Sequence, residues 1–366
     1  MSVGLLAVAA MALGLAFANG ANDNAKGVAT LIGAGRLSAG PAVRYATAAT
    51  LLGSVAAWVL AEGLLARFSG EGILAAELLG TPALSIAVGG AAAGTVLLAT
   101  RLGLPVSTTH ALVGALAGVG LASGTLRGAA LAGAFLGPLL LSPLVALSAT
   151  AAGYPLLRRL RIALGVRHDQ CLCLTTTAAL PSAGGALARP GTLGIVRNEV
   201  ERCSGYVGTV AGVSAQRALD GCHLVTAGAV SFARGVNDAP KIAALLVVAG
   251  PLGLTGPSSL LLVGTVMAAG GLLAARRIAD TMSHRITTMN DGQALTANLA
   301  TAALVLVASR LGMPVSTTHV SVGALFGIGI VGGSARGRTI TAIVLAWVAV
   351  LPLAALLAAA IWWVVS

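Results

Sequence analysis

The chain has 366 residues, of which 57% are hydrophobic and only 9% are charged, and its mean hydropathy is +0.94. Ordinary soluble domains carry about 25% charged residues, so this composition excludes a soluble globular protein and indicates a polytopic helical membrane protein. The formal net charge of +11 fits the excess of Lys and Arg in cytoplasmic loops and requires no nucleic-acid partner.

Long apolar segments form two sets of five along the chain. The first set covers residues 3–34, 41–67, 81–104, 108–122 and 127–157, and the second covers residues 222–249, 257–275, 287–313, 317–331 and 338–365. A segment rich in Arg, Gly and Thr separates them. We therefore expect a first membrane repeat in residues 1–157, a cytoplasmic loop in residues 158–219, and a second membrane repeat in residues 220–366.

Two motifs recur in the same order in both halves. The segment Ala99–Gly120 returns as Ala308–Gly329 with sixteen of 22 positions identical, and Gly20–Lys26 returns as Gly235–Lys241. Two motifs that recur in the same order indicate one duplicated unit. A duplicated apolar unit that carries polar motifs inside its hydrophobic segments is typical of secondary transporters.

The junction of the third and fourth segments predicts a hairpin in each half. Pro105 and Pro314 end the preceding helix, and Ser107 and Ser316 are suitable N-caps for the next one. The fourth segment has only about 15 residues, whereas a membrane-spanning helix needs about 20. We expect two re-entrant helical hairpins and three crossings per half, so that the second half is inverted. The predicted fold is an all-α integral membrane protein with inverted-topology repeats.

The distribution of arginine predicts the orientation. Residues 158–219 are rich in arginine, which places this segment in the cytoplasm and both termini outside a multi-pass protein of the cell membrane. The cysteines in and beside this segment are interpreted as free cytosolic thiols: Cys171, Cys173, Cys203 and Cys222.

The repeated Asn-Asp pairs are candidate cation ligands. A carboxylate at membrane depth is costly and is kept where it meets a partner or a water-filled cavity. Flanking glycines and Pro240 predict a helix break there, which would add backbone carbonyls to side-chain oxygens and suit Na⁺. The alternative is a structural ion pair with Lys26 and Lys241, three residues on. The predicted cation ligands are Asn22, Asp23, Asn237 and Asp238, with the two carboxylates as the sodium ligands.

The hairpin tips are candidate anion ligands. Each tip offers three hydroxyl groups at a helix N-terminus, where backbone N–H groups are free and the dipole is positive. Neutral donors of this kind bind an oxyanion without holding it too tightly for transport. The alternative is a simple cap that satisfies the first N–H groups of the helix. The candidate residues are Ser107, Thr108, Thr109, Ser316, Thr317 and Thr318.

Several other polar residues have weaker assignments. His110 and His319 are interpreted as packing residues rather than metal or proton sites, and Arg101 and Arg310 either steer an anion or anchor at the interface. Ser and His three residues apart also fit an intramembrane hydrolase. Catalysis needs one serine and one base, however, and not two copies wrapped in threonines, so no enzyme is expected. Asn290, Asp291 and Asn298 have no assigned role.

Taken together, these motifs resemble the inorganic phosphate transporter (PiT) family of cation–phosphate symporters over nearly the whole chain except the central segment. The resemblance implies an inverted-repeat fold, often dimeric, in which the Asn-Asp motifs serve cation coupling and the hairpin hydroxyls hold phosphate. Many members carry glutamates where this chain has Thr50 and Asn298. From the shared motifs we expect phosphate uptake by symport with Na⁺, without other cofactors, by a homodimer in the lipid bilayer. H⁺ is the alternative cation, sulfate the alternative substrate, and an anion channel the alternative class.

Overall fold

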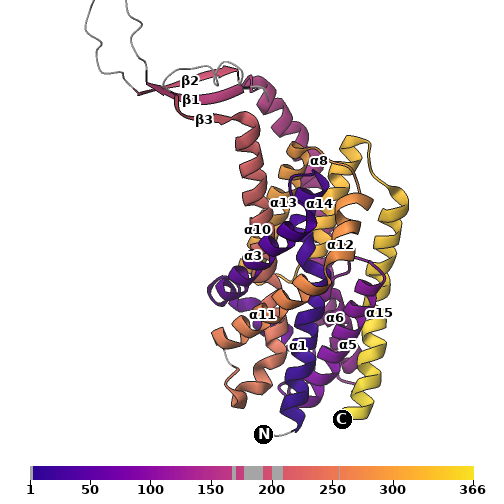
Figure 1. Ribbon diagram of the computed structural model, residues 1–366. Coiled ribbons are helices and arrows are strands. Elements are labelled where there is room, and N and C mark those ends of the chain that lie inside the picture. Colours follow the sequence, from indigo (N-terminus) through magenta and orange to yellow (C-terminus); the bar gives the residue numbers. More distant parts are fainter. Residues whose placement is uncertain (1–2, 167–169, 177–192, 200–208, 255) are drawn as a thin grey trace, which may run out of the picture.

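The computed structural model describes residues 3–166, 170–176, 193–199, 209–254 and 256–366. It is an elongated helical bundle with a small β sheet beyond one end, and both termini lie at the opposite end (Figure 1). Among the described residues, seven helical stretches are long and apolar enough to cross a membrane. The multi-pass helical architecture expected from the composition is therefore confirmed.

The first half contributes five long helices and several short ones. The long helices are α1 (Val3–Asp23), α3 (Ala39–Leu60), α5 (Pro82–Arg101), α6 (Thr108–Ala122) and α8 (Gly137–Ala163). The short elements are 3₁₀ helices at Asn24–Val28 and Ala76–Leu78, α2 (Ala29–Gly33), α4 (Glu62–Phe68), α7 (Gly128–Leu131) and a π-helical turn at Ala132–Leu136.

The second half repeats this plan. Its long helices are α10 (Ala215–Ala243), α11 (Gly256–Ala274), α13 (Asp291–Arg310), α14 (Thr317–Gly332) and α15 (Gly337–Val365). A 3₁₀ segment at Ala244–Leu252, the short α12 (Arg276–Asp280) and a π-helical turn at Thr281–Arg285 connect them. Helix α10 is long enough to span a membrane. It is much less apolar than its counterpart α1, because it carries the charged residues Arg217, Asp220, Arg234, Asp238 and Lys241.

The packing of the helices follows the duplication. Helix α1 packs against α5 and α11, and its counterpart α10 packs against α13 and α3. The hairpin helix of each half packs against the last helix of the other half, α6 on α15 and α14 on α8. The two halves are thus intertwined around a shared centre.

In each half the third and fourth segments form a helix–turn–helix pair, whose first helix is itself long and apolar enough to cross a membrane. Helices α5 and α13 end in turns at Gly103 and Gly312, whose φ angles of +72° and +64° favour glycine. The chain then runs extended to the next helix. Figure 1 places the α5–α6 pair toward the end with the termini and the α13–α14 pair toward the end with the sheet, as expected of hairpins that enter from opposite sides.

The expected helix break at the Asn-Asp motifs occurs in only one half. Helix α1 gives way to 3₁₀ geometry directly after Asp23, but α10 continues unbroken through Asn237 and Pro240. The neighbouring glycines serve close packing instead. A Cβ on Gly20 would lie 1.9 Å from the backbone oxygen of Met267, and one on Gly235 would lie 2.2 Å from that of Thr50.

The central segment contains strands that the sequence analysis did not predict. Strands β1 (Gln170–Thr176), β2 (Leu193–Glu199) and β3 (Thr209–Ser214) form an antiparallel sheet in the order β2-β1-β3. Cys171 is disulfide-bonded, so the interpretation as a free thiol is wrong for this residue, whereas Cys222 is free. Cys203 and the side chain of Cys173 lie outside the described part of the chain.

Candidate functional site

The two hairpin tips begin their helices as predicted. The Ser107 hydroxyl accepts a hydrogen bond from the backbone N–H of His110 at 3.1 Å, and Ser316 accepts one from His319 at 3.2 Å. Both serines are N-caps of the helices that start at Thr108 and Thr317. Because all six tip hydroxyl residues are buried, the capping groups lie inside the bundle and not at its surface.

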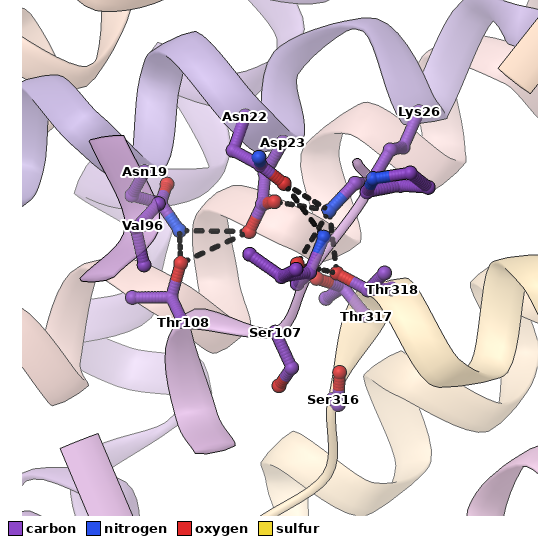
Figure 2. Close-up of polar contacts among 12 residues, drawn as sticks. Asn19, Asn22, Asp23, Lys26, Val96, Ser107, Thr108, Ser316, Thr317 and Thr318 are labelled. Atoms are coloured by element: carbon purple, nitrogen blue, oxygen red, sulfur yellow. Dashed lines mark hydrogen bonds and ion pairs between the residues drawn. The ribbon is translucent and has the colours of Figure 1, made fainter. Parts of the chain in front are cut away.

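The tips contact each other across the two halves. Thr318 donates to the backbone oxygen of Val106 at 2.8 Å, and Thr109 donates to that of Val315 at 3.3 Å. The internal repeat relates the two contacts, because Thr109 corresponds to Thr318 and Val106 corresponds to Val315. They bring the two Pro-Val-Ser-Thr-Thr-His motifs, 209 residues apart in the chain, to one point (Figure 2).

The two motif asparagines hold the extended segments of the hairpins. The Asn22 amide donates to the backbone oxygen of Leu104 at 3.1 Å, and its oxygen accepts from the Val106 N–H at 3.1 Å. Asn237 donates to the backbone oxygen of Val315 at 3.3 Å. These side chains therefore position the tips, because they satisfy backbone groups that no helix satisfies there.

The two motif lysines reach the same point. The Lys26 ammonium forms an ion pair with Asp23 and donates to Val106 O at 2.8 Å and to the Thr318 hydroxyl at 2.6 Å (Figure 2). Lys241 lies 3.5 Å from Asp238 and donates to Val315 O and to Thr109. The structural ion pairs weighed as an alternative to a cation site are thus present in both halves.

The two aspartates converge on one amide, which the sequence analysis did not single out. The Asn19 Nδ2 atom lies 3.0 Å from an Asp23 carboxylate oxygen, 3.2 Å from an Asp238 oxygen and 3.0 Å from the Thr108 hydroxyl. Thr317 donates to Asp238 at 3.5 Å. The carboxylates from opposite halves therefore share a centre with one threonine from each tip.

A buried arginine completes this centre and was also missed. Arg234 is 2% exposed, and its Nη2 donates to Asn19 Oδ1 at 3.5 Å. Its Nε and Nη1 are buried without a hydrogen-bond partner among the described residues. Because Gly20 aligns with Gly235, Arg234 occupies the repeat position of Asn19. Extending the alignment of the two motifs by one residue toward the N-terminus would have identified Arg234 from the sequence.

The formal charges at the centre sum to an excess of one positive charge. Three cationic side chains, Lys26, Arg234 and Lys241, lie with two carboxylates, Asp23 and Asp238, and each of the five is at most 3% exposed. A buried charge is costly unless it is paired. Unpartnered guanidinium donors beside an excess of buried positive charge are features that suit an anion.

The remaining sequence candidates lie outside this centre. The rings of His110 and His319 stack at 4.3 Å between centroids, and His319 stacks on Trp347 at 3.7 Å, which agrees with a packing role. The Arg101 and Arg310 side chains are exposed, and Arg310 donates to the backbone oxygen of Val59. Asn290 caps α13, Asp291 pairs with Arg36, Asn298 accepts from Thr30, and Thr50 donates to Ser231 O.

One contact resembles a catalytic pair. The Ser316 hydroxyl lies 2.8 Å from His319 Nδ1. A nucleophile also needs a third group that orients the base, and none of the described hydrogen bonds joins a carboxylate to His319. In the other half, His110 Nδ1 has no partner among the described residues. The serine–histidine contact is therefore present at only one of the two tips among the described residues.

An intertwined, duplicated helical bundle with a buried, positively charged centre between two hairpin tips is the architecture of a membrane transporter. The sequence profile of the phosphate transporter family matches residues 19–358. The chain belongs to this family, and the resemblance stated from its motifs is confirmed.

Individual relatives agree with this assignment. The chain is 28% identical to a protein of Pyrococcus abyssi that is named as a phosphate permease, over 99% of this chain and 98% of that protein. It is 28% identical to the chloroplastic inorganic phosphate transporter 2-1 of Arabidopsis thaliana, over 98% of this chain and 72% of that one. A solved structure of a protein named "The sodium-dependent phosphate transporter" has the same fold, with a TM-score of 0.77, 22% identity and 99% coverage of both chains.

Proposed function

We propose that this phosphate transporter family member takes up inorganic phosphate by secondary transport, in symport with a cation. The observation that carries the proposal is the buried centre where both tips, both aspartates and Arg234 meet. Arg234 brings two nitrogen atoms, Nε and Nη1, that have no partner among the described residues, and Thr108 and Thr317 add one hydroxyl from each half. Phosphate offers acceptor oxygens to all of them.

The two carboxylates favour phosphate over sulfate as the substrate. Hydrogen phosphate carries a proton that it donates to a carboxylate, whereas sulfate at neutral pH has only acceptor oxygens. Asp23 and Asp238 both reach the centre, since each lies within hydrogen-bond distance of Asn19. Sulfate adds no donor for either carboxylate and brings its negative charge beside them, so sulfate binds more weakly in this account.

Na⁺, predicted from the sequence, and H⁺ are the two candidate coupling cations. The structural neighbour is named as sodium-dependent, and the Asn-Asp motifs supply oxygen ligands. The same oxygens contact lysine ammonium groups, which favours the alternative in which Na⁺ does not bind there. Coupling to either cation distinguishes the transporter from an anion channel, because channel flux needs no cation gradient.

The proposed orientation follows from the arginine-rich central segment. The sheet-bearing segment lies at the end of the bundle opposite both termini (Figure 1). With this segment in the cytoplasm, both termini lie outside the cell membrane. We further propose a homodimer, as the family resemblance implies.

Radiolabelled phosphate uptake into proteoliposomes tests the function. Gradients of Na⁺ and of H⁺ are imposed separately, with excess unlabelled sulfate in a parallel assay. We expect saturable uptake that requires one cation gradient and persists in sulfate. Flux without either gradient would indicate a channel, and block by sulfate would assign the substrate to sulfate.

The tip residues are tested in the same assay. Replacing Ser316 and Thr317 together by alanine should raise the half-saturating phosphate concentration or abolish uptake. Ser258 lies at the exposed start of α11, where its hydroxyl donates to the backbone oxygen of Gly253, and Ser258→Ala provides the control. Unchanged uptake kinetics in the tip variant would show that the tip is only a helix cap.

A further inference from the structure

We propose that Lys26 and Lys241 are tethered cations that occupy the two positions predicted for Na⁺, so that phosphate binding at the hairpin tips does not require Na⁺ there. The part that concerns phosphate rests on the proposed function. The part that concerns Na⁺ rests only on the contacts of the two ammonium groups.

The Lys26 ammonium lies inside a shell of oxygen atoms from both halves of the chain. It donates to Val106 O at 2.8 Å, to Asn22 Oδ1 at 3.0 Å and to Thr318 Oγ1 at 2.6 Å, and it pairs with Asp23. Carboxylate, amide, carbonyl and hydroxyl oxygens are the ligands that a hard cation takes in proteins. An ammonium group has three donors, and these four oxygens use all of them.

The Lys241 ammonium has the corresponding shell in the second half. It donates to Val315 O at 2.7 Å and to Thr109 Oγ1 at 2.8 Å, and Asp238 lies 3.5 Å away. Each lysine therefore contacts the carbonyl of its own tip, the threonine of the opposite tip and the aspartate of its own motif. The repetition shows that the arrangement belongs to the duplicated unit and is not a local accident of one half.

These contacts use the oxygens that Na⁺ would need. Asn22, Asp23 and Asp238 face an ammonium group, and the Asn237 amide oxygen accepts from Ser309 at 3.2 Å. A sodium ion at either position would either displace the ammonium group or lie next to it. Two adjacent positive charges repel strongly in a buried site. The residues present therefore do not fit Na⁺ while the lysines remain.

The consequence for phosphate is that its counter-charge is built into the chain. Each ammonium joins the two hairpin tips, because it binds the backbone of one tip and a hydroxyl of the other. A dissociable cation would have to bind first in order to join the tips in this way. In this chain the positive charge and the cross-link are present at any Na⁺ concentration.

The first experiment measures Na⁺ binding to the purified full-length protein in detergent, by ²²Na⁺ equilibrium binding and by melting temperature in NaCl against choline chloride. A ligand that binds the folded state raises the melting temperature. We expect the wild type to show neither saturable binding nor a sodium-specific rise. Saturable binding by the wild type would overturn the proposal.

Two pairs of variants separate the charge of each lysine from its volume. Lys26→Ala and Lys241→Ala vacate the oxygen shell, so these variants should gain saturable ²²Na⁺ binding and a sodium-specific rise in melting temperature. Lys26→Met and Lys241→Met fill the shell without charge and should gain neither. Folded alanine variants without Na⁺ binding would show that the oxygens form no cation shell, which contradicts the proposal.

The second experiment measures radiolabelled phosphate binding to the same proteins. The wild type should bind phosphate equally in NaCl and choline chloride, whereas the alanine variants should bind at least about tenfold more tightly in NaCl. Phosphate binding by the wild type that requires Na⁺ would overturn the proposal. Absence of phosphate binding in both salts would reject the proposed function, and the ²²Na⁺ result would still decide the role of the lysines.

Discussion

Arg234 is the residue that most changes the interpretation of the site. The sequence motifs supplied hydroxyl groups and carboxylates, but the centre they form also holds a guanidinium group with two unpartnered donors. A guanidinium group combines a permanent positive charge with N–H donors in a fixed planar geometry, so one side chain provides both charge and orientation for phosphate. The repeat position of Arg234 is Asn19, and the centre is therefore asymmetric although the chain is duplicated.

Replacing Arg234 by glutamine tests its role. Removal of a charged partner from a buried anion site costs several kcal/mol, so the half-saturating phosphate concentration should rise by about 100-fold or more. Radiolabelled phosphate uptake into proteoliposomes measures the change. Arg338→Gln is the control, because the side chain of Arg338 at the start of α15 is exposed and its replacement should leave uptake unchanged. Equal kinetics in both variants would remove Arg234 from the anion site.

Single and double variants of the Asp23–Lys26 ion pair distinguish a role in stability from a role in transport. Asp23→Asn leaves a buried ammonium uncompensated, which costs about 3–5 kcal/mol, so the melting temperature should fall. Asp23→Asn combined with Lys26→Met removes both charges and should recover most of that stability without recovering phosphate uptake. Uptake at the wild-type rate in the double variant would mean that the pair is only structural.

Residue-level prediction succeeded where a motif implied its own local partner. The Ser107 and Ser316 caps follow from spacing along one helix, and so do the lysine–aspartate pairs, which the sequence offered only as the alternative to a cation site. The contacts of Asn19 and Arg234 could not be predicted in this way, because they join helices α1 and α10 that are far apart in the sequence.

At the scale of elements, the helix break expected at the Asn-Asp motifs occurs after Asp23 but not in the second half. We expected the flanking glycines to permit this break, but α10 runs unbroken through its motif, and Gly235 faces the backbone of α3. Small residues allow membrane helices to approach closely. The glycines thereby bring the motif helices against their neighbours and place Asp23 and Asp238 at one centre.

Gly235→Ala tests the close approach. Its Cβ would lie 2.2 Å from the Thr50 oxygen, so overpacking should destabilise the protein by about 1–3 kcal/mol or more and lower its melting temperature. Gly14→Ala in α1 is the matched control, since no atom lies within 4 Å of the added Cβ. Alanine there should be neutral or slightly stabilising. A similar melting temperature for both variants would argue against tight packing at Gly235.

The hairpins were predictable because their signals are local. A proline, a serine cap and a helix too short to span the bilayer were sufficient, and α6 and α14 begin one residue after the capping serines. The sheet in the central segment was not predictable in the same way. Its strands pair over intervals of up to about 40 residues, as Cys171 with Ser214, and the register depends on those distant partners.

At the scale of the whole molecule, duplication explains why the site lies in the middle. Each half supplies one Asn-Asp helix and one hairpin, and the hairpin helix of each half packs on the last helix of the other. Relative motion of the halves therefore rearranges the contacts between the tips. If the proposed transport proceeds by such a motion, the four hydroxyl and ammonium bonds across the tips are among the contacts that must break.

A cryo-EM map of the full-length protein in saturating phosphate, compared with a map in phosphate-free buffer, tests the central claim most directly. The account predicts added density at the centre where the tips meet, within hydrogen-bond distance of Arg234 and of a tip threonine. Density confined to the cavity of about 560 Å³ that Arg158 and Arg161 line beside α13, with none at the tips, would contradict it.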